Sequence, residues 1–572
     1  MALNTRYHDE LTYLRELGKE FAAAHPDAAP MLAESGSDPD VERLLEGFAF
    51  LTARLRQKLD DELPELTQSL VDALWPDWLR PIPPICMLQF EPVRVADKEQ
   101  RSVPRGVVVE SKPVDGTRCR FRTTLEVEVP PLRISALRLV AAAPARLEIR
   151  LSFNEGVSAK TSGLRRLRLH ASGPMAVSAS LHDLLVRHTT AIEIVAGERR
   201  VRLPERSVRA IGDGPDAALL GAAAPGYTGF SQLREWSAFP SRFLFSEVTG
   251  LEAVAKLGEA TSVDLVCHLD RVPDGIPQLS ESNLLLGCTP AVNLFEADAD
   301  PVSVDPRSRE YRVRPSGDDP AHREISAVEA VAGIIAGGDK PKPLARLFRG
   351  GRAPDREAPA WLARRSTTPD GRLLTSLSFS GSLAEFEAIS IQLTCTNGRL
   401  AQAIAPGDVS IPGPGIPPTL RVRNLAKPTP HIPPPLGGQL DWRLLAQLGL
   451  NWRTLADAEG LRSTLEIHHV RAASDMQARL ALKRLCSAIV SVAARPDTQV
   501  SDGALVRGVC VELLIREDGF DGEGDIALFA AVLDELISQR ATLNSFGRLR
   551  VRGEQTGLVL DLPARLGSRR LV

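Results

Sequence analysis

The segment Trp75-Pro-Asp-Trp-Leu-Arg-Pro81 divides the sequence into two parts with different hydrophobic periods. Before it, apolar residues recur every three or four positions, which is the period of an amphipathic helix. From Ile82 onward, apolar and polar residues alternate, as they do in half-buried antiparallel strands. Because proline cannot continue a helical hydrogen-bond ladder, the last helix must end at this segment. The sequence therefore predicts a helical N-terminal part joined to a β-rich body.

Three amphipathic helices are predicted before this segment. The first spans residues 7–21, the second spans residues 41–59, and Pro64 opens the third. Asp38 and Pro39 suit the N-cap and the first position of the second helix. Because three helices in about 75 residues enclose only a small core, we expect their apolar stripes to pack elsewhere. The pattern leaves open whether they pack on the rest of the chain or on helices of another protein.

After residue 80 the sequence predicts two β-rich domains. Alternating apolar positions indicate strands over residues 81–225, with one short helix near residues 181–188. A second β-rich domain follows over residues 226–430 and includes a basic loop at 337–366, which we expect to be exposed. Near its end, the proline-rich residues 427–438 indicate an extended connector.

Residues 431–572 are predicted to form a C-terminal α/β domain. Helices are expected at 440–448, 456–468, 474–492 and 526–540, and strands at 504–515, 546–552 and 558–562. The expected fold class is therefore α+β and multi-domain. It comprises an N-terminal helical segment over residues 1–80, two β-rich domains of antiparallel sandwich or barrel-like form, and the α/β domain.

Length and composition exclude several classes of protein. A chain of 572 residues suggests about three to five domains. The net charge of −3 gives no sign of nucleic-acid binding. Residues 1–72 are acidic, with 15 acidic and 7 basic side chains, which is a mild indication of a protein partner. The seven cysteines show no Cys-x-x-Cys spacing, which favours reduced thiols. No signal peptide and no apolar run of about 20 residues is present, so we expect a soluble protein.

Motifs for catalysis or cofactor binding are not found in the sequence. There is no phosphate-binding glycine loop, no nucleophile elbow and no His-Glu-x-x-His. Glu466, His468 and His469 are adjacent but lack further ligands, so we expect a polar helix end there. The acidic residues 518–525 do not fit a calcium-binding loop and are expected to connect a strand to a helix. We therefore expect a non-enzymatic protein with no cofactor and no metal.

Several blocks of sequence, in a fixed order, resemble the TssF (ImpG/VasA) family of type VI secretion baseplate subunits. The blocks are Tyr7-His-Asp-Glu-Leu-Thr-Tyr-Leu-Arg-Glu-Leu-Gly18, Asp38-Pro-Asp-Val-Glu-Arg-Leu-Leu-Glu-Gly-Phe-Ala-Phe-Leu-Thr-Ala-Arg54, Phe239-Pro-Ser-Arg-Phe-Leu-Phe245, Cys288-Thr-Pro-Ala-Val-Asn-Leu-Phe-Glu296, Leu393-Thr-Cys-Thr-Asn397 and Leu543-Asn-Ser-Phe546. They run from one end of the chain to the other, so the resemblance covers nearly all of it. His8 stands where the family pattern suggests a second aromatic residue.

The resemblance implies a non-catalytic part of a contractile, phage-like baseplate wedge. It implies assembly with TssG, TssK and TssE around the VgrG spike, with a second TssF copy in the wedge. It also implies a cytoplasmic location in a bacterium, docked at the inner membrane through the membrane complex and without membrane insertion. The alternatives are a phage-derived baseplate protein outside type VI secretion and a β-rich carbohydrate-binding protein.

We expect the stripes of the first two helices to pack with TssG or with the second TssF copy. The alternative is that these stripes form an internal core. The candidate interface residues are Tyr7, Leu11, Leu14, Phe21, Val41, Leu44, Phe48, Leu51, Leu55 and Leu59.

Overall fold

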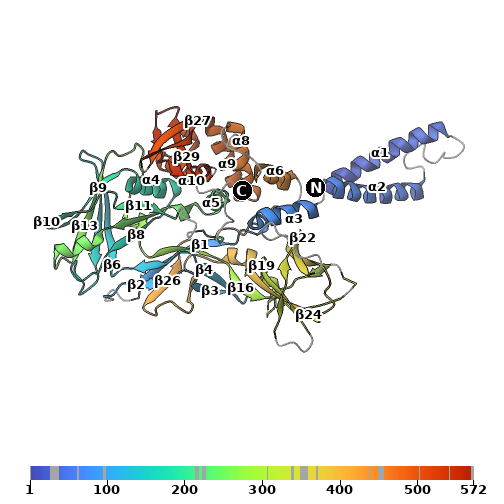
Figure 1. Cartoon of the computed structure of the whole chain (residues 1–572), viewed down its shortest axis with the longest axis horizontal. Coiled ribbons are helices and arrows are strands. Elements are labelled where there is room, and N and C mark those ends of the chain that lie inside the picture. The colour runs from blue at the N-terminus through green and yellow to red at the C-terminus, as the bar shows by residue number, and fades with distance from the viewer. Residues whose placement is uncertain are drawn as a thin grey trace.

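The structure is a computed structural model of the whole chain. It describes residues 2–25, 38–60, 64–93, 98–212, 218–221, 227–305, 307–308, 310–317, 319–335, 340–347, 358–368, 371–436, 439–448, 457–501, 503–539 and 541–567. The molecule has a mixed α+β body with many antiparallel sheets and a helical arm that projects from it (Figure 1).

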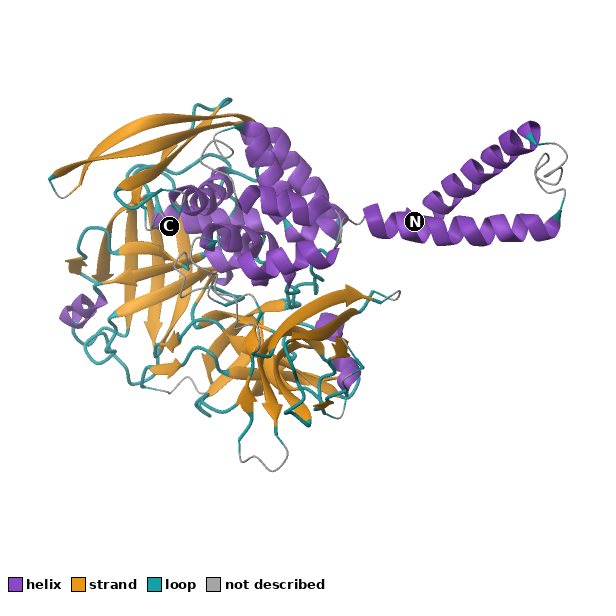
Figure 2. Ribbon diagram, turned by 45° about the vertical axis from the view of Figure 1, so that its right-hand side comes forward, coloured by secondary structure: helices purple, strands orange, loops and turns teal. Residues whose placement is uncertain are grey.

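The three N-terminal helices are present as predicted. They are α1 (Ala2–Ala24), α2 (Pro39–Asp60) and α3 (Pro64–Leu74). The side chain of Asp38 accepts the backbone N–H of Asp40, which satisfies one of the free donors at the start of α2. Helices α1 and α2 lie against each other and extend away from the body, whereas α3 lies on it (Figures 1 and 2).

The first strand of the body belongs to a nearly closed, barrel-like sheet. Its order is β25 (Val409–Pro412), β3 (Val108–Val114), β4 (Thr117–Thr123), β15 (Cys288–Val292), β1 (Ile85–Pro92) and β26 (Leu420–Asn424). Asn424 joins the two edges of this sheet, because its side-chain oxygen accepts the N–H of Val409 at 2.9 Å. Strands β2 (Arg101–Val103) and β5 (Val127–Val129) pair with each other and form a separate two-stranded antiparallel ribbon.

Two further sheets form the centre of the molecule. One has the order β10 (Arg199–Arg202), β9 (Thr189–Ala196), β13 (Ser262–Leu269), β7 (Arg146–Phe153) and β6 (Leu132–Val140). The other has the order β11 (Val208–Ile211), β12 (Phe245–Thr249), β8 (Arg166–Ala171) and β14 (Leu284–Leu285). Helix α4 (Met175–Val186) packs on both.

Two sheets form a lobe beside the barrel-like sheet. The first contains β16 (Phe295–Asp298), β24 (Ala388–Thr396), β19 (Glu324–Ile334) and β20 (Lys342–Pro343), with β17 (Val302–Ser303) also on β24. The second contains β18 (Glu310–Arg312), β23 (Leu373–Ser380), β22 (Ala360–Thr367) and β21 (Ala345–Arg346). They enclose a separate core around Trp361, Ile391 and Leu393.

The C-terminal part combines helices with one mixed sheet. The helices are α6 (Gln439–Leu448), α8 (Ala458–His468), α9 (Met476–Ala488) and α10 (Glu523–Ser538). The sheet contains β27 (Ile489–Ser501), β28 (Ala504–Ile515), β29 (Ser545–Gly553) and β30 (Val559–Asp561), with β31 (Arg565–Leu566) on β29. Strands β28 and β29 are parallel, and α10 connects them.

Sheet pairing crosses the boundary that the sequence suggested near residue 225. Strands from 81–225 pair with strands from 226–430 in the barrel-like sheet and in both central sheets. The boundary therefore does not coincide with a gap between sheets. Residues 427–436 form no helix or strand, and within them Ile432 makes an isolated bridge to Ile82 beside the first strand.

Two predictions of secondary structure are wrong. The helix expected to run to residue 492 ends at Ala488, and the β-branched residues Ile489, Val490 and Val492 begin β27 instead, because such side chains favour strands. The basic loop expected to be exposed at 337–366 contains β20, β21 and, from Ala360 onward, β22, and its Leu344, Ala360 and Trp361 are buried. Residues 336–339 and 348–357 of this region lie outside the described residues.

Helix α3, the central sheets and the C-terminal helices meet at a buried aromatic cluster. Trp75 and Trp78, at the end of α3 and in the short 3-10 helix η2 (Pro76–Leu79), have at most 1% of their surface exposed. The guanidinium of Arg234 in α5 (Thr228–Ala238) lies 5.4 Å and 4.9 Å from their ring centres and donates to the carbonyl of Asp77. Burial lowers the pKa of Arg234 to about 10, so it stays charged at neutral pH.

His468 completes the cluster from the C-terminal part. Its ring stacks on Phe230 at 4.6 Å and meets Trp75 and Trp78 at 5.7 Å and 5.5 Å. The sequence predicted a polar helix end at Glu466, His468 and His469. This prediction is wrong for His468, because its side chain is fully buried. One continuous core joins α3, both central sheets and the C-terminal helices through this cluster.

We predict that Trp75→Ala destabilises the whole body. Removing a fully buried indole leaves a cavity among α3, α5 and α8 and should cost about 3–5 kcal/mol of unfolding free energy. Chemical denaturation followed by tryptophan fluorescence and circular dichroism measures the loss. Trp442→Ala, at a position that is 39% exposed, is the matched control and should have a much smaller effect. Equal losses in the two variants would show that the cluster is not central to the core.

Candidate protein-protein interface

The contact between α1 and α2 is made by small and apolar side chains. Leu11 and Ala22 on α1 and Ala49 and Ala53 on α2 are all buried. The alanines leave room for the two helix backbones to approach closely. An ion pair between Arg15 and Glu42, 2.7 Å apart, lies at the edge of the contact. The two helices therefore form a hairpin whose own core is narrow.

Large apolar side chains on both helices are left exposed. Leu44 is the most exposed, at 74%, and Phe48 follows at 60%. Besides Phe50, the exposed large apolar residues described on the two helices are Tyr13, Leu17 and Phe21 on α1, and Leu44, Phe48 and Leu51 on α2. We call these six residues the hairpin face.

Helix geometry places the hairpin face on one side of the pair. Successive residues of a helix are about 100° apart around its axis. We measure the angle around each helix axis from the buried contact residue, which is Leu11 on α1 and Ala49 on α2, looking from the N- to the C-terminus. On both helices the residues of the hairpin face are rotated from the contact residue in the same sense. In two antiparallel helices, the same sense of rotation from the contact leads to the same side. The opposite side is mostly polar and includes Thr12, Lys19, Arg43 and Glu46, with Phe50 as an exception.

The ten residues predicted from the sequence fall into different environments. Leu11 lies inside the hairpin, and Tyr7, Leu14 and Val41 are half-buried at its edge. Those exposed on the hairpin face are Phe21, Leu44, Phe48 and Leu51, while the side chains of Leu55 and Leu59 lie outside the described residues. Sequence periodicity missed Tyr13 and Leu17. The spacing of four residues from Tyr13 to Leu17 to Phe21 is the signal that could have identified them.

A continuous apolar face of this kind is typical of a protein-protein contact. Monomeric proteins rarely expose large contiguous apolar patches, and a helix with an unburied apolar stripe gains stability by packing on another helix. Burying one Leu or Phe side chain contributes roughly 1.5–3 kcal/mol. Six such residues in one patch make the hairpin face a candidate contact for partner helices.

The described residues hold one cluster with the ligand types of a metal site. Asp183, His188 and Glu523 offer ligand atoms within 4.8 Å of one another. Arg187 is 2.8 Å from Asp183 and also pairs with Glu523, and Arg271 pairs with Glu523 as well. Basic side chains thus already neutralise these carboxylates, so the arrangement fits an ion-pair network better than a cation site.

This network joins the central sheets to the C-terminal part. Its members come from α4, from the turn after α4 that holds Arg187 and His188, from the loop after β13 and from the first residue of α10. Burial alone would lower the pKa of His188, but hydrogen bonds to Asp183, Glu523 and Asp270 outweigh burial and raise it to about 9. Burial likewise opposes the charged form of Glu523, but the bonds from His188, Arg187 and Arg271 lower its pKa to about 2. His188 is therefore protonated at neutral pH.

The other acidic and histidine residues singled out by sequence do not converge. Glu466 is exposed beside Arg443, and the ring of His469 faces Trp236 at 6.4 Å. In the 518–525 segment, Asp521 pairs with Arg484 at 2.5 Å, and α10 begins at Glu523. These side chains act in packing and ion pairing.

Comparisons with known proteins agree with one another. A family model described as "Type VI secretion system, TssF" matches residues 1–569. The type VI secretion system component TssF1 of Pseudomonas aeruginosa is 28% identical over 617 residues, covering 98% of both chains.

Two solved structures resemble the whole fold. One chain of the TssK-TssF-TssG baseplate subcomplex of a type VI secretion system superposes with a TM-score of 0.77 at 30% identity, covering 92% of this chain and 99% of that chain. A chain of the type VI secretion baseplate complex gives a TM-score of 0.65 at 26% identity, covering 99% and 100%.

We predict that the hairpin contact and the hairpin face respond differently to charge. Ala49→Glu places a carboxylate in the fully buried contact and should separate α1 from α2. Phe48→Glu changes only an exposed position and should leave the free protein folded. Limited trypsin digestion at Arg43 and Arg54 of α2 measures the difference, and only Ala49→Glu should be cut faster. Faster cleavage of both variants would contradict the assignment of Phe48 to an outer face.

We predict that His188 makes the stability of the body depend on pH. The folded pKa of about 9 exceeds the unfolded value of about 6.5, so this stabilisation is complete below pH 6.5 and is lost as pH rises through 9. The unfolding free energy of the protein should therefore fall between these two values, and His188→Gln should remove that part of the fall. Exposed His8 provides the control variant His8→Gln. An identical pH profile for His188→Gln and the unmodified protein would contradict the prediction.

Proposed function

The chain belongs to the TssF family of type VI secretion proteins, and we propose that it joins the baseplate wedge through its hairpin face. The family match over residues 1–569 and the likeness to chains of two baseplate assemblies support a structural baseplate role. The exposed apolar patch on α1 and α2 is the observation that favours this mode of attachment.

The partners we propose are TssG and TssK in the first place. A chain in a solved subcomplex named for these two proteins and TssF has the same fold as this protein. We further propose contacts with TssE and the VgrG spike, and a second copy of this chain in each wedge. The relatives are structural components of the baseplate, which supports a role without catalysis.

The hairpin face suits a helical bundle shared with TssG and the second copy. Two helices with one apolar side provide half of a four-helix bundle, which needs two more amphipathic helices to enclose its core. The polar side of the hairpin, with Lys19, Arg43 and Glu46, would stay in water. The exposed stripe therefore has the geometry expected of an incomplete bundle.

The location we propose is the cytoplasmic side of the inner membrane, reached through the membrane complex. Within the described residues, no helix combines the length and the apolar character needed to span a membrane. The family match along nearly the whole chain favours type VI secretion over a phage-derived baseplate or a carbohydrate-binding protein.

Co-expression with TssG and TssK of the same secretion system tests the proposal. We expect the unmodified chain to co-purify with both, and light scattering should give two copies of it per TssG. Phe48→Glu combined with Leu51→Glu should lower the affinity for TssG by at least about tenfold, because each buried side chain contributes roughly 1.5–3 kcal/mol. Arg43→Glu, on the polar side of α2, is the control and should bind normally.

Two outcomes would contradict the proposal at different levels. Normal binding of TssG by the double variant would remove the hairpin face as the attachment site. A folded chain that binds neither TssG nor TssK would remove the wedge role itself.

A further inference from the structure

The lobe beside the barrel-like sheet is a single insertion into that sheet, formed by residues 295–396. All its strands, β16 to β24, follow β15 and precede β25, and in the described part of the chain they pair only with one another. The buried core of the lobe is equally self-contained, since its first member is Phe295 and its last is Cys395. The chain therefore enters the lobe once and leaves it once.

The two chain crossings lie side by side and are joined by polar contacts. The side-chain amide of Asn293 donates to Oδ1 of Asn397 at 2.9 Å, and its own Oδ1 accepts the backbone N–H of Asn397 at 2.7 Å. We call these two residues the crossing pair. Beside them, the hydroxyl of Thr117 in β4 lies 2.8 Å from a ring nitrogen of His322 in the lobe. These contacts fix the point at which the lobe joins the barrel-like sheet.

A second attachment connects the lobe to α3. Arg346 in β21 forms an ion pair with Asp72, which is 8% exposed, and its guanidinium lies 5.4 Å from the ring centre of Trp361. Arg365 in β22 is equally buried and donates to the carbonyl of Ser326. Its other terminal nitrogen, Nη1, has no hydrogen-bond partner, and it forms no ion pair with a carboxylate of the described residues. This attachment therefore contains more basic than acidic groups.

Three arginines act on the one buried carboxylate of this attachment. Arg346 and Arg365 belong to the lobe, whereas Arg80 follows η2 in the body and pairs with Asp77 at 3.2 Å. Burial raises the pKa of Asp72, and the charges of all three arginines oppose that rise. Burial lowers the pKa of Arg365 to about 10, and repulsion by Arg80 adds to this effect. The charge of Asp72 thus offsets a repulsion between lobe and body.

A polar cleft of about 610 Å³ separates lobe and body between the two attachments. Glu296 and Glu329 line it from the lobe and Arg122 lines it from β4, and no ion pair joins these three in the part of the chain described. None of the hydrophobic cores of the described residues spans lobe and body. The lobe therefore rests on the body through polar contacts.

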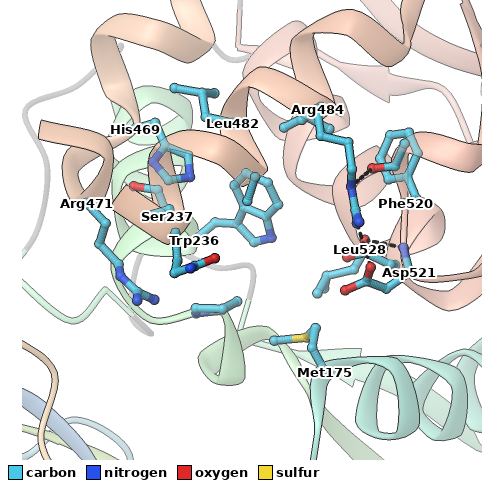
Figure 3. Close-up of a pocket in the computed structure, with 17 residues that line it drawn as sticks. Met175, Trp236, Ser237, His469, Arg471, Leu482, Arg484, Phe520, Asp521 and Leu528 are labelled. Carbon is cyan, nitrogen blue, oxygen red and sulfur yellow. Dashed lines mark hydrogen bonds and ion pairs between the residues drawn. The ribbon is translucent and has the colours of Figure 1, made fainter. Parts of the chain in front are cut away.

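The pocket beside Trp236, among the C-terminal helices, shows the contrast with this cleft. It measures about 330 Å³, and Leu482, Leu485 and Leu528 in its lining all belong to one continuous core (Figure 3). The helices around that pocket are thus held together by apolar packing, which the junction between lobe and body lacks.

We propose that the lobe is a hinged unit, which pivots on the crossing pair and is held against α3 by the charge of Asp72. Domains that meet through small, polar interfaces move relative to each other, and a hinge needs only a few residues where the chain crosses. The ion pair of Asp72 with Arg346 is the latch of this hinge. Because α3 follows the α1–α2 hairpin in sequence, the latch ties the position of the lobe to the helix at the base of the arm. The inference does not depend on the proposed function.

Distances between spin labels in the full chain test the latch. One label replaces Glu252 in the body and the other replaces Ala384 in the lobe, both at exposed positions and both carried on an unnatural amino acid. Pulsed electron resonance should give one narrow distance distribution for the chain with Asp72. Asp72→Asn, which keeps the shape but removes the charge, should add a population displaced by more than about 2 Å. Labels at Thr367 and Ala384, both inside the lobe, should keep their distance.

Two further variants test the physical cause of the displacement. Arg80→Gln added to Asp72→Asn should reduce the displaced population at least about twofold, because it removes the repelling charge on the body. Glu385→Gln removes a carboxylate that pairs with Lys342 inside the lobe, so it is the matched control and should leave both distances unchanged.

Four outcomes would overturn the proposal. They are a broad Glu252–Ala384 distribution while Asp72 is intact, an unchanged distribution in Asp72→Asn, an equal displacement in Glu385→Gln, and a displacement that Arg80→Gln does not reduce. A changed distance between Thr367 and Ala384 would also overturn it, because the lobe would then unfold rather than pivot.

Discussion

The insertion of Arg234 between Trp75 and Trp78 determines how the parts of this protein are joined. A buried guanidinium is costly, and here the cost is offset by two aromatic faces and by the carbonyl of Asp77. Those partners lie within four successive residues at the end of α3. Because α5 supplies the arginine and α8 supplies His468, the cluster forms only when all three helices are in place. Helix α3, the central sheets and the C-terminal helices therefore share one buried contact.

The body and the arm differ in how completely they bury their apolar surface. In the body, even charged side chains are inside, as the network around His188 and Glu523 shows. In the arm, the small side chains of Ala49 and Ala53 allow α1 and α2 to pack closely, but the contact buries little apolar surface. The large residues point outward instead. A helix pair of this kind is well suited to assembly, because its contact surface is already formed before the partner arrives.

Much of the local structure was predictable, and the reasons for the failures are physical. Helices α1 to α3 and strands such as β28 have clear periods of 3.6 and 2, and they were identified from the sequence. The whole of β27 was missed. An alanine- and leucine-rich helix runs directly into the β-branched first residues of this strand with no Gly or Pro between them. Sheet order could not be predicted, since β1 pairs with β15 and β26 from distant parts of the chain.

The candidate interface shows a second kind of limit. A stripe in one helix marks its apolar residues but does not say which of them its neighbour covers. Leu11 and Phe21 belong to one stripe, yet one is 6% and the other 49% exposed. Only the packing of α1 on α2 separates them. The pocket beside Trp236 left no sequence signal, because residues from segments far apart in the chain line it.

The long-range closure of the barrel-like sheet has a consequence for synthesis on the ribosome. Glu91 at the end of β1 pairs with Arg421, 330 positions later, so this sheet closes only after most of the chain has emerged. The α1–α2 hairpin, by contrast, is encoded entirely within the first 60 residues. It can therefore form long before the barrel-like sheet closes, and its apolar face is uncovered while translation continues. Early capture by a partner, during translation, would shield that face from aggregation until the body has folded.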